Sequence, residues 1–349
     1  MLTYILKRLL LMIPTLFGIM LITFLVTQFV PGGPVEQMVN QLSGKGGVAE
    51  ASSGSESLYR GQQGLDPEII AKIRSQYGFD KPAYERFVIM MGNYLRFDFG
   101  DSYFHHKSVM ELVVDKLPVS ISLGIWTFLI TYLVSIPLGI KKAIRDGSRF
   151  DAWTSTLILI GYAIPGFVLG ITLLVLLGGG SFWDLFPLRG LVSDNWDQLP
   201  WWSQVTDYLW HMVLPITAMS VGSLAVMTLL TKNSFVEEIR KQYVITARAK
   251  GLSENAVMYR HVFRNAMIPL VTGFPAAFVG AFFTGSLLIE QIFSLDGLGL
   301  LAYESVLQRD YPVVLGTLYM FSILALIAKL LSDLSYVLID PRIQFESAS

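Results

Sequence analysis

The 349-residue sequence contains no cysteine and few charged side chains. The absence of cysteine excludes disulfides, thiolate-bound zinc, iron–sulfur clusters and a cysteine nucleophile. Charged residues make up 15% and hydrophobic residues 53% of the chain, whereas soluble globular domains have about 25% charged residues. Because 26 basic and 27 acidic residues leave a net charge of -1, the chain lacks the basic surplus of a nucleic-acid-binding protein. The composition therefore predicts a membrane protein.

Motifs for catalysis and nucleotide binding are also missing. The sequence has no H-E-x-x-H, no G-x-S-x-G and no phosphate-binding loop, so we do not expect this chain to hydrolyse ATP by itself. The four histidines lack carboxylate or histidine neighbours at metal-ligand spacing, and we predict no metal site. The residues 297–302 match the dinucleotide fingerprint G-x-G-x-x-A but lie between two apolar runs, so we expect only a tight backbone turn there.

Six apolar runs are long enough to cross a membrane, which takes about 20 helical residues. They cover residues 9–30, 118–140, 153–177, 212–230, 267–289 and 312–338. Soluble core helices usually keep a polar face, whereas these runs are apolar around their whole circumference. The first run is longer than the apolar part of a signal peptide and has no cleavage site after it, so we expect it to be a retained anchor. The sequence predicts an all-α polytopic membrane protein with six transmembrane helices.

The distribution of lysine and arginine predicts how these helices are oriented. Residues 141–150 and 231–266 hold 11 Lys or Arg, whereas residues 178–211 and 290–311 hold 2. Because basic residues concentrate in cytoplasmic loops, the first pair and both termini are expected in the cytoplasm. We therefore divide the chain into the first helix (1–30), a periplasmic segment (31–117), a core of five helices (118–338) with a cytoplasmic loop at 231–266, and a cytoplasmic tail (339–349).

The outer segment is expected to contain a loop and three short helices. Residues 41–64 are rich in glycine and serine and predict a flexible loop. A capping pattern at Asp66 predicts a helix over 67–77, and a second helix is expected over 82–95. Apolar residues at helical spacing predict an interfacial helix over 108–117, which leads into the second span.

The middle spans hold no ionisable groups, which disfavours a proton-driven or voltage-sensing mechanism. Lys329 and Asp333 lie one turn apart in the last run, where we expect them to be paired or to reach towards the interface. The spans instead contain proline and glycine, which favour either a translocation path or ordinary close packing of helices. As candidates for the path we select Pro137, Tyr162, Pro165, Phe167, Phe274, Phe278 and Phe282.

The cytoplasmic loop has a pattern of helix, glycine and helix. Residues 235–250 alternate charged with small and apolar residues, Gly251 is placed as a C-cap, and a second helix starts after Leu252. Such a hairpin suits docking into a groove on another protein. From the residues alone, a solvated basic loop is the simpler alternative.

Two stretches of this loop resemble the inner-loop signature of permease subunits of ABC importers of the dipeptide and oligopeptide class. They are Tyr243-Val244-Ile245-Thr246-Ala247-Arg248-Ala249-Lys250-Gly251-Leu252-Ser253 and His261-Val262-Phe263-Arg264-Asn265-Ala266. The resemblance extends over nearly the whole chain, including residues 6–10, 77–82, 284–286, 309–312 and 340–342. Residues 188–193 and the glycine–serine loop resemble the Yej-type branch, which is linked to uptake of peptides including microcin C-like antibiotics. One departure is that Ile245-Thr246-Ala247 stands where the general pattern has Glu-Ala-Ala.

The resemblance implies a type I ABC importer architecture in the bacterial inner membrane. A second, homologous permease chain would complete a heterodimer, and two ATPase domains, fused in one chain in the Yej-type branch, would bind ATP and magnesium. A periplasmic peptide-binding protein would deliver the substrate, and alternating access would move it. The residues then expected to contact the ATPase are Tyr243, Thr246, Ala247, Arg248, Ala249, Lys250, Gly251, His261, Arg264 and Asn265. Those expected to dock the binding protein are Glu290, Asp296, Arg309 and Asp310.

Two other classes of function remain as alternatives, an ion-coupled carrier or channel and a membrane scaffold. The lack of ionisable groups in the middle spans argues against an ion-coupled carrier or channel. A membrane scaffold would not need the proline and glycine residues that interrupt the helices. The substrate stays open among a dipeptide, an oligopeptide, a microcin and a nickel chelate, because few charges line the spans.

Overall fold

A computed structural model describes residues 2–30, 33–35, 75, 78–179, 182–283 and 286–339. The loop expected at 41–64, the helix expected at 67–77, residues 284–285, the tail from 340 onwards and the Phe282 side chain lie outside the described residues. All regular elements among the described residues are helical, apart from two isolated bridges.

In the part of the chain that the structure describes, four helices are long and apolar enough to cross a membrane by themselves, and the number of candidate spans is six if each of two bent helix pairs is one span. The four are α1 (Leu2–Phe29), α5 (Val109–Ile144), α8 (Trp201–Ile239) and α15 (Tyr311–Ile339). The shorter helices are α4 (Ala83–Tyr94), α6 (Arg149–Ala163), α7 (Gly166–Leu177), α9 (Gln242–Ala249), α10 (Glu254–Ala256), α11 (Phe263–Ala266), α12 (Ile268–Phe283), α13 (Leu287–Ile292) and α14 (Leu298–Gln308). The prediction of an all-α polytopic protein is confirmed.

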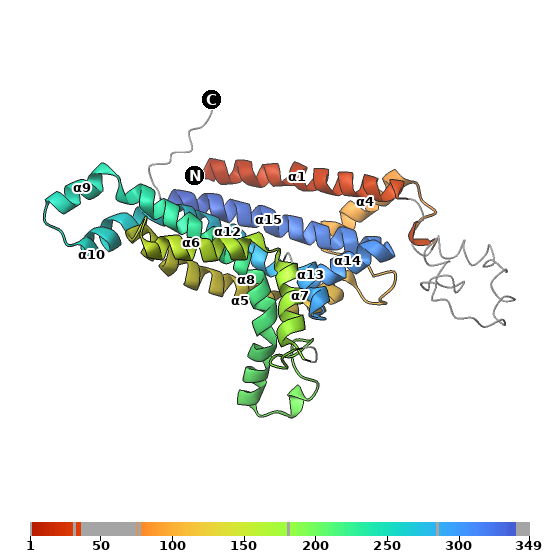
Figure 1. The fold of residues 1–349 in the computed structure, drawn as a ribbon. Coiled ribbons are helices and arrows are strands. Elements are labelled where there is room, and N and C mark those ends of the chain that lie inside the picture. Colours follow the sequence, from red (N-terminus) through yellow and green to blue (C-terminus); the bar gives the residue numbers. More distant parts are fainter. Residues whose placement is uncertain are drawn as a thin grey trace. The chain divides into compact units, whose positions relative to one another are not determined.

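The third predicted span, 153–177, is not one straight helix. It consists of α6 and α7, which meet at an angle of 92°. Pro165 has no backbone N–H and pushes the preceding residue out of the helical region. Ile164 is accordingly extended, with φ -88° and ψ 120°. After the bend α7 lies beside α8 (Figure 1), and a Cβ at Gly166 would stand 2.9 Å from the carbonyl oxygen of Ala218.

The second span is longer than predicted, because α5 is continuous from Val109 to Ile144. The helix expected over 108–117 is present as the first turns of α5, so it is continuous with the span and not a separate element. Its place at the membrane interface stays a prediction. Ser108 and Glu111 form a capping box: Ser108 Oγ accepts from the Glu111 N–H, and the Glu111 carboxylate accepts from the Ser108 N–H, both at 3.2 Å. Pro118 and Pro137 both lie inside this helix.

The chain forms two compact units. The first comprises residues 1–5, 116–300 and 324–349, and the second comprises residues 6–115 and 301–323. In the first unit, buried Leu123, Met212 and Phe293 form part of an apolar core between α5, α8 and the end of α13. In the second unit, the rings of Tyr94, Phe99 and Tyr319 lie 5.0 to 5.8 Å apart.

Candidate functional site

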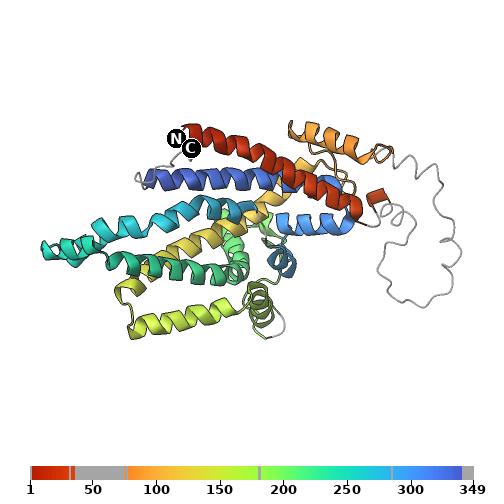
Figure 2. The ribbon, with the colours of Figure 1, turned by 90° about the horizontal axis from the view of Figure 1, so that it is seen from above.

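The predicted hairpin is present, but its first helix is shorter than expected. The structure divides residues 235–250 between the end of α8 and α9, because Lys241 has an extended backbone with ψ 149°. Gly251 has φ +79°, as expected of a C-cap, and Ser253 caps the second half by accepting from the Ala256 N–H. We call residues 242–266 the coupling hairpin; Figures 1 and 2 show α9 and α10 projecting beyond the start of α6.

An apolar core fixes the coupling hairpin to the end of α8. Val244, Val257 and Val262 are fully buried against Phe235 of α8 and Ala143 of α5. Ala247 is 7% exposed and belongs to the same core. Its side chain therefore faces inwards, and the expectation that it approaches a partner closely does not fit this arrangement. The hairpin is therefore packed against α8 and α5 through this core and is not a loop surrounded by water on all sides.

Tyr243 links three helices of this region. Its hydroxyl donates to the Glu238 carboxylate of α8 at 2.7 Å and accepts from the Asn265 amide of α11 at 3.2 Å. Burial, together with the hydrogen bond to Glu238, raises the pKa of Tyr243 to about 12. Tyr243 and Asn265, both predicted as ATPase contacts, thus have internal partners that hold the two halves of the hairpin together.

The outer surface of the coupling hairpin combines basic and apolar side chains. The Arg248 guanidinium forms a bidentate salt bridge with Glu254, in which Nε and Nη2 lie 2.9 Å and 3.1 Å from the two carboxylate oxygens. The other predicted contact residues Thr246, Ala249, Lys250, Gly251 and Arg264 are exposed, and His261 is half-buried. The predicted contact residues do not include Ile245, Leu252 or Tyr259, although 39 to 68% of each side chain is exposed. Exposed apolar groups beside charges suit a surface that another protein covers.

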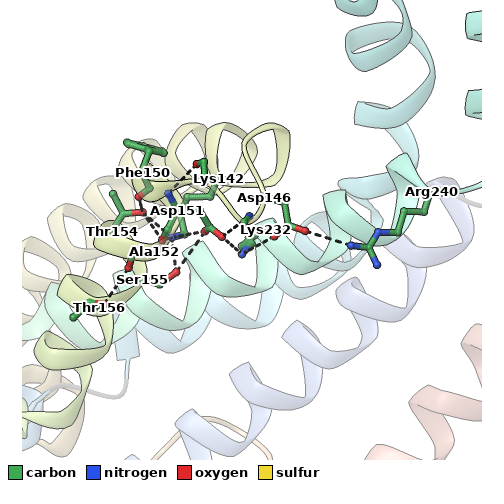
Figure 3. A network of polar contacts seen from close by, with 12 residues as sticks. Lys142, Asp146, Phe150, Asp151, Ala152, Thr154, Ser155, Thr156, Lys232 and Arg240 are labelled. Carbon is green, nitrogen blue, oxygen red and sulfur yellow. Dashed lines mark hydrogen bonds and ion pairs between the residues drawn. The ribbon is translucent and has the colours of Figure 1, made fainter.

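A buried charge network lies where the coupling hairpin joins the spans (Figure 3). Lys142 of α5 has no exposed surface; its ammonium group lies 3.0 Å from Asp151 Oδ1 and donates to Thr154 at 2.7 Å and Ser155 at 2.8 Å. The other carboxylate oxygen of Asp151 is 2.6 Å from the ammonium group of Lys232 on α8. Asp151 is thus held between two lysines, and it joins α5, α6 and α8.

Asp146 extends this network to the root of the hairpin. It pairs with Lys232 at 3.0 Å and with Arg240 at 3.3 Å (Figure 3), and Arg240 is the residue directly after α8. This network was not predicted from the sequence, where residues 141–150 indicated only a basic loop. The pattern Ser148-x-x-Asp151 is the one local signal, since Ser148 caps α6.

The path candidates lie in two places within the first unit. Tyr162 and Phe167 line a cavity of about 830 Å³ together with Met219 and Met227 of α8. Phe274 and Phe278 pack with Phe128, with ring centroids 5.0 and 5.6 Å from it. Pro137 and Pro165 are exposed, and their place in a path stays a prediction. At the end of α15, Lys329 and Asp333 form the expected pair, 3.9 Å apart.

The four docking candidates differ in their exposure. Glu290 is fully buried and accepts the N–H groups of Ser286 at 3.0 Å and of Leu300, in the first turn of α14, at 2.7 Å. The tight turn expected at 297–302 is wrong, because residues 298–302 begin a helix. Asp310 is also fully buried and accepts from Ser102 and the Tyr103 N–H. Neither carboxylate can touch a docking protein in this arrangement. Docking stays a prediction for half-buried Arg309 and for Asp296, whose side chain is 67% exposed.

Known proteins resemble the chain over its whole length. Residues 135–345 match a family described as "Binding-protein-dependent transport system inner membrane component". The peptidoglycan transport system permease protein YejB of Agrobacterium fabrum is 62% identical, with 98% of each chain covered. The inner membrane ABC transporter permease protein YejB of Escherichia coli O157:H7 is 56% identical, with 98% of this chain and 99% of the relative covered. The dipeptide transport system permease protein DppB of Escherichia coli K12 is 32% identical, with 99% of each covered.

Proposed function

Because the chain belongs to the family of binding-protein-dependent transport system inner membrane components, we propose that it is a permease subunit of an ATP-driven peptide importer. It is a multi-pass inner membrane protein and a transport subunit. The observation that carries the proposal is the identity of 62% and 56% to two YejB permeases along nearly their full lengths. The resemblance seen in the inner loop is thereby confirmed.

The partners we propose are a second permease chain, two ATPase domains that bind ATP and magnesium, and a periplasmic peptide-binding protein. The loop charges support placing the coupling hairpin and both termini in the cytoplasm. The names of the relatives support peptides or peptidoglycan fragments as cargo, and the resemblance to the Yej-type branch adds microcin C-like antibiotics.

We infer that the coupling hairpin transmits ATP-driven closure of the ATPase to the spans as alternating access. Shifting an equilibrium between two states of the permease from 1:99 to 99:1 requires contacts with the ATPase that favour one state over the other by about 5.5 kcal/mol. To transmit this energy, the coupling hairpin must not bend where it joins the spans. The apolar core around Val257 and the ion pairs of Asp151 both stabilise this junction.

The proposed function is tested by uptake into proteoliposomes that contain the complete transporter. We expect labelled peptide to accumulate only with hydrolysable ATP on the ATPase side and the binding protein on the other side. A proton ionophore should leave uptake unchanged. An ATPase variant that lacks its phosphate-loop lysine is the control. Uptake that follows an ion gradient without ATP would instead show an ion-coupled carrier.

Gly251 separates a transport role from a scaffold role. Its φ of +79° is costly for side chains other than glycine, least for asparagine and most for β-branched residues. We expect Gly251→Val to reduce ATP-dependent uptake at least tenfold in an assembled complex, and Gly251→Asn to keep most of it. A Cβ there meets no atom within 4 Å, so the effect arises from the backbone. Equal uptake in both variants and in the unaltered chain would oppose a coupling role for this turn.

A further inference from the structure

Helix α4 lies beside the end of α1 that reaches Phe29 (Figures 1 and 2). Phe87 of α4 packs its ring 5.6 Å from that of Phe17 and 5.2 Å from that of Phe24. In a helix that rises about 1.5 Å per residue, Phe24 and Phe17 lie roughly 8 and 18 Å inside the end of α1. Since α1 is a candidate membrane span, these contacts place Phe87 at the depth of the hydrocarbon.

One face of α4, extended by its C-cap residue Leu95, is apolar and exposed. Tyr84, Val88 and Leu95 lie at positions i, i+4 and i+11, and they are 75%, 66% and 72% exposed. The spacing puts them on one side of the helix, next to the buried side formed by Phe87 and Tyr94. We call Tyr84, Val88 and Leu95 the α4 stripe.

The polar side of α4 has a different environment. Arg86 and Asn93 line a cavity of about 940 Å³ within the second unit, together with Lys81 and Lys107. The Arg86 guanidinium hydrogen-bonds Gln28 of α1 and lies 4.9 Å from the ring centroid of Phe79. A cavity of this size with polar walls can hold water. Arg86 and Asn93 therefore lie on the side of α4 that faces this cavity, away from the stripe.

We propose that α4 is half inserted in the membrane and that the α4 stripe lies against the phospholipid acyl chains of the leaflet reached by Phe29. The occupant follows from continuity with α1, whose most apolar part is only 11% buried and which exposes Ile22, Val26 and Phe29 at the same end. If α4 is inserted in this way, part of the segment 31–117 lies within the bilayer, whereas the sequence predicted that the segment lies wholly outside it. The proposal rests on the membrane placement of α1 and does not depend on the transported substrate.

This chain has no native cysteine, so one cysteine introduced into it gives one label per copy of the chain once the partner subunits have been made cysteine-free. In the complete transporter, Val88→Cys is labelled with bimane in detergent and reconstituted into nanodiscs with native or brominated phospholipids. We expect brominated lipid to quench the fluorescence at least twofold. An unlabelled sample in nanodiscs should react at least tenfold more slowly with a charged maleimide than Arg96→Cys, the exposed control just beyond α4.

Tyr84→Cys repeats the measurement one turn earlier and guards against an effect special to one position. Fast maleimide reaction without quenching would place the stripe in water and overturn the proposal. Slow reaction without quenching would mean that a partner protein covers the stripe, and this outcome overturns it as well. Assembly of each variant is checked by size-exclusion chromatography before labelling.

Discussion

Replacing Asp151 with alanine is expected to lower the free energy of unfolding by about 3 to 5 kcal/mol, the usual cost of removing one partner from a buried ion pair. Asp151 is 6% exposed and lies between the ammonium groups of Lys142 and Lys232. Without the carboxylate, the fully buried Lys142 keeps only neutral acceptors and faces a second cation. The junction between α5, α6 and α8 should therefore loosen.

Thermal unfolding of the complex in detergent, at one scan rate for all variants, measures this effect. Asp146→Ala is the matched control, because Asp146 also pairs with Lys232 but its side chain is 37% exposed; we expect it to cost less than about 1 kcal/mol. Adding Lys142→Met to Asp151→Ala should recover part of the loss, because no buried cation is then left without its carboxylate. Equal unfolding temperatures for Asp151→Ala and Asp146→Ala would refute a special role for the buried carboxylate.

The apolar runs predicted the spans because lipid demands about 20 apolar residues regardless of tertiary contacts. The bend at Pro165 could not be predicted in the same way. Pro137 lies inside the continuous α5, whereas the helix breaks before Pro165. The outcome depends on what the neighbouring helices offer to the freed backbone groups, and the sequence of one span does not contain that information.

The sequence likewise identified some features of the functional site, whereas others are visible only in the folded structure. The resemblance identified the segment from Tyr243 to Gly251, but it could not tell which side of α9 faces inwards. That is decided by Phe235 and Val262, which bury Ala247 and leave Arg248 outside. The pairing of Asp151 with Lys232, 81 residues away, exists only after α6 and α8 have packed. The sequence therefore predicts the hairpin but not its attachment.

Replacing Arg248 with glutamate is expected to reduce ATP-dependent uptake at least tenfold while the complex continues to hydrolyse ATP. Arg248 is one of the exposed basic groups of the coupling hairpin, and charge reversal there should weaken the proposed contact with the ATPase. Parallel assays of peptide uptake and phosphate release in proteoliposomes measure the ratio of the two rates. An unchanged ratio would remove Arg248 from the coupling residues.

Arg248 also pairs with Glu254, so the reversal places two like charges opposite each other. The double variant Arg248→Glu/Glu254→Arg restores the pair but leaves the outward charge pattern reversed. The two side chains are 39% and 66% exposed, and a pair so exposed contributes about 0.2 to 1 kcal/mol, at most a roughly fivefold effect. A tenfold or larger loss that persists in the double variant therefore requires a contact beyond the hairpin. Recovery in the double variant would mean that Arg248 only holds the hairpin together, and coupling would then depend on Lys250, Arg264 and the exposed apolar groups.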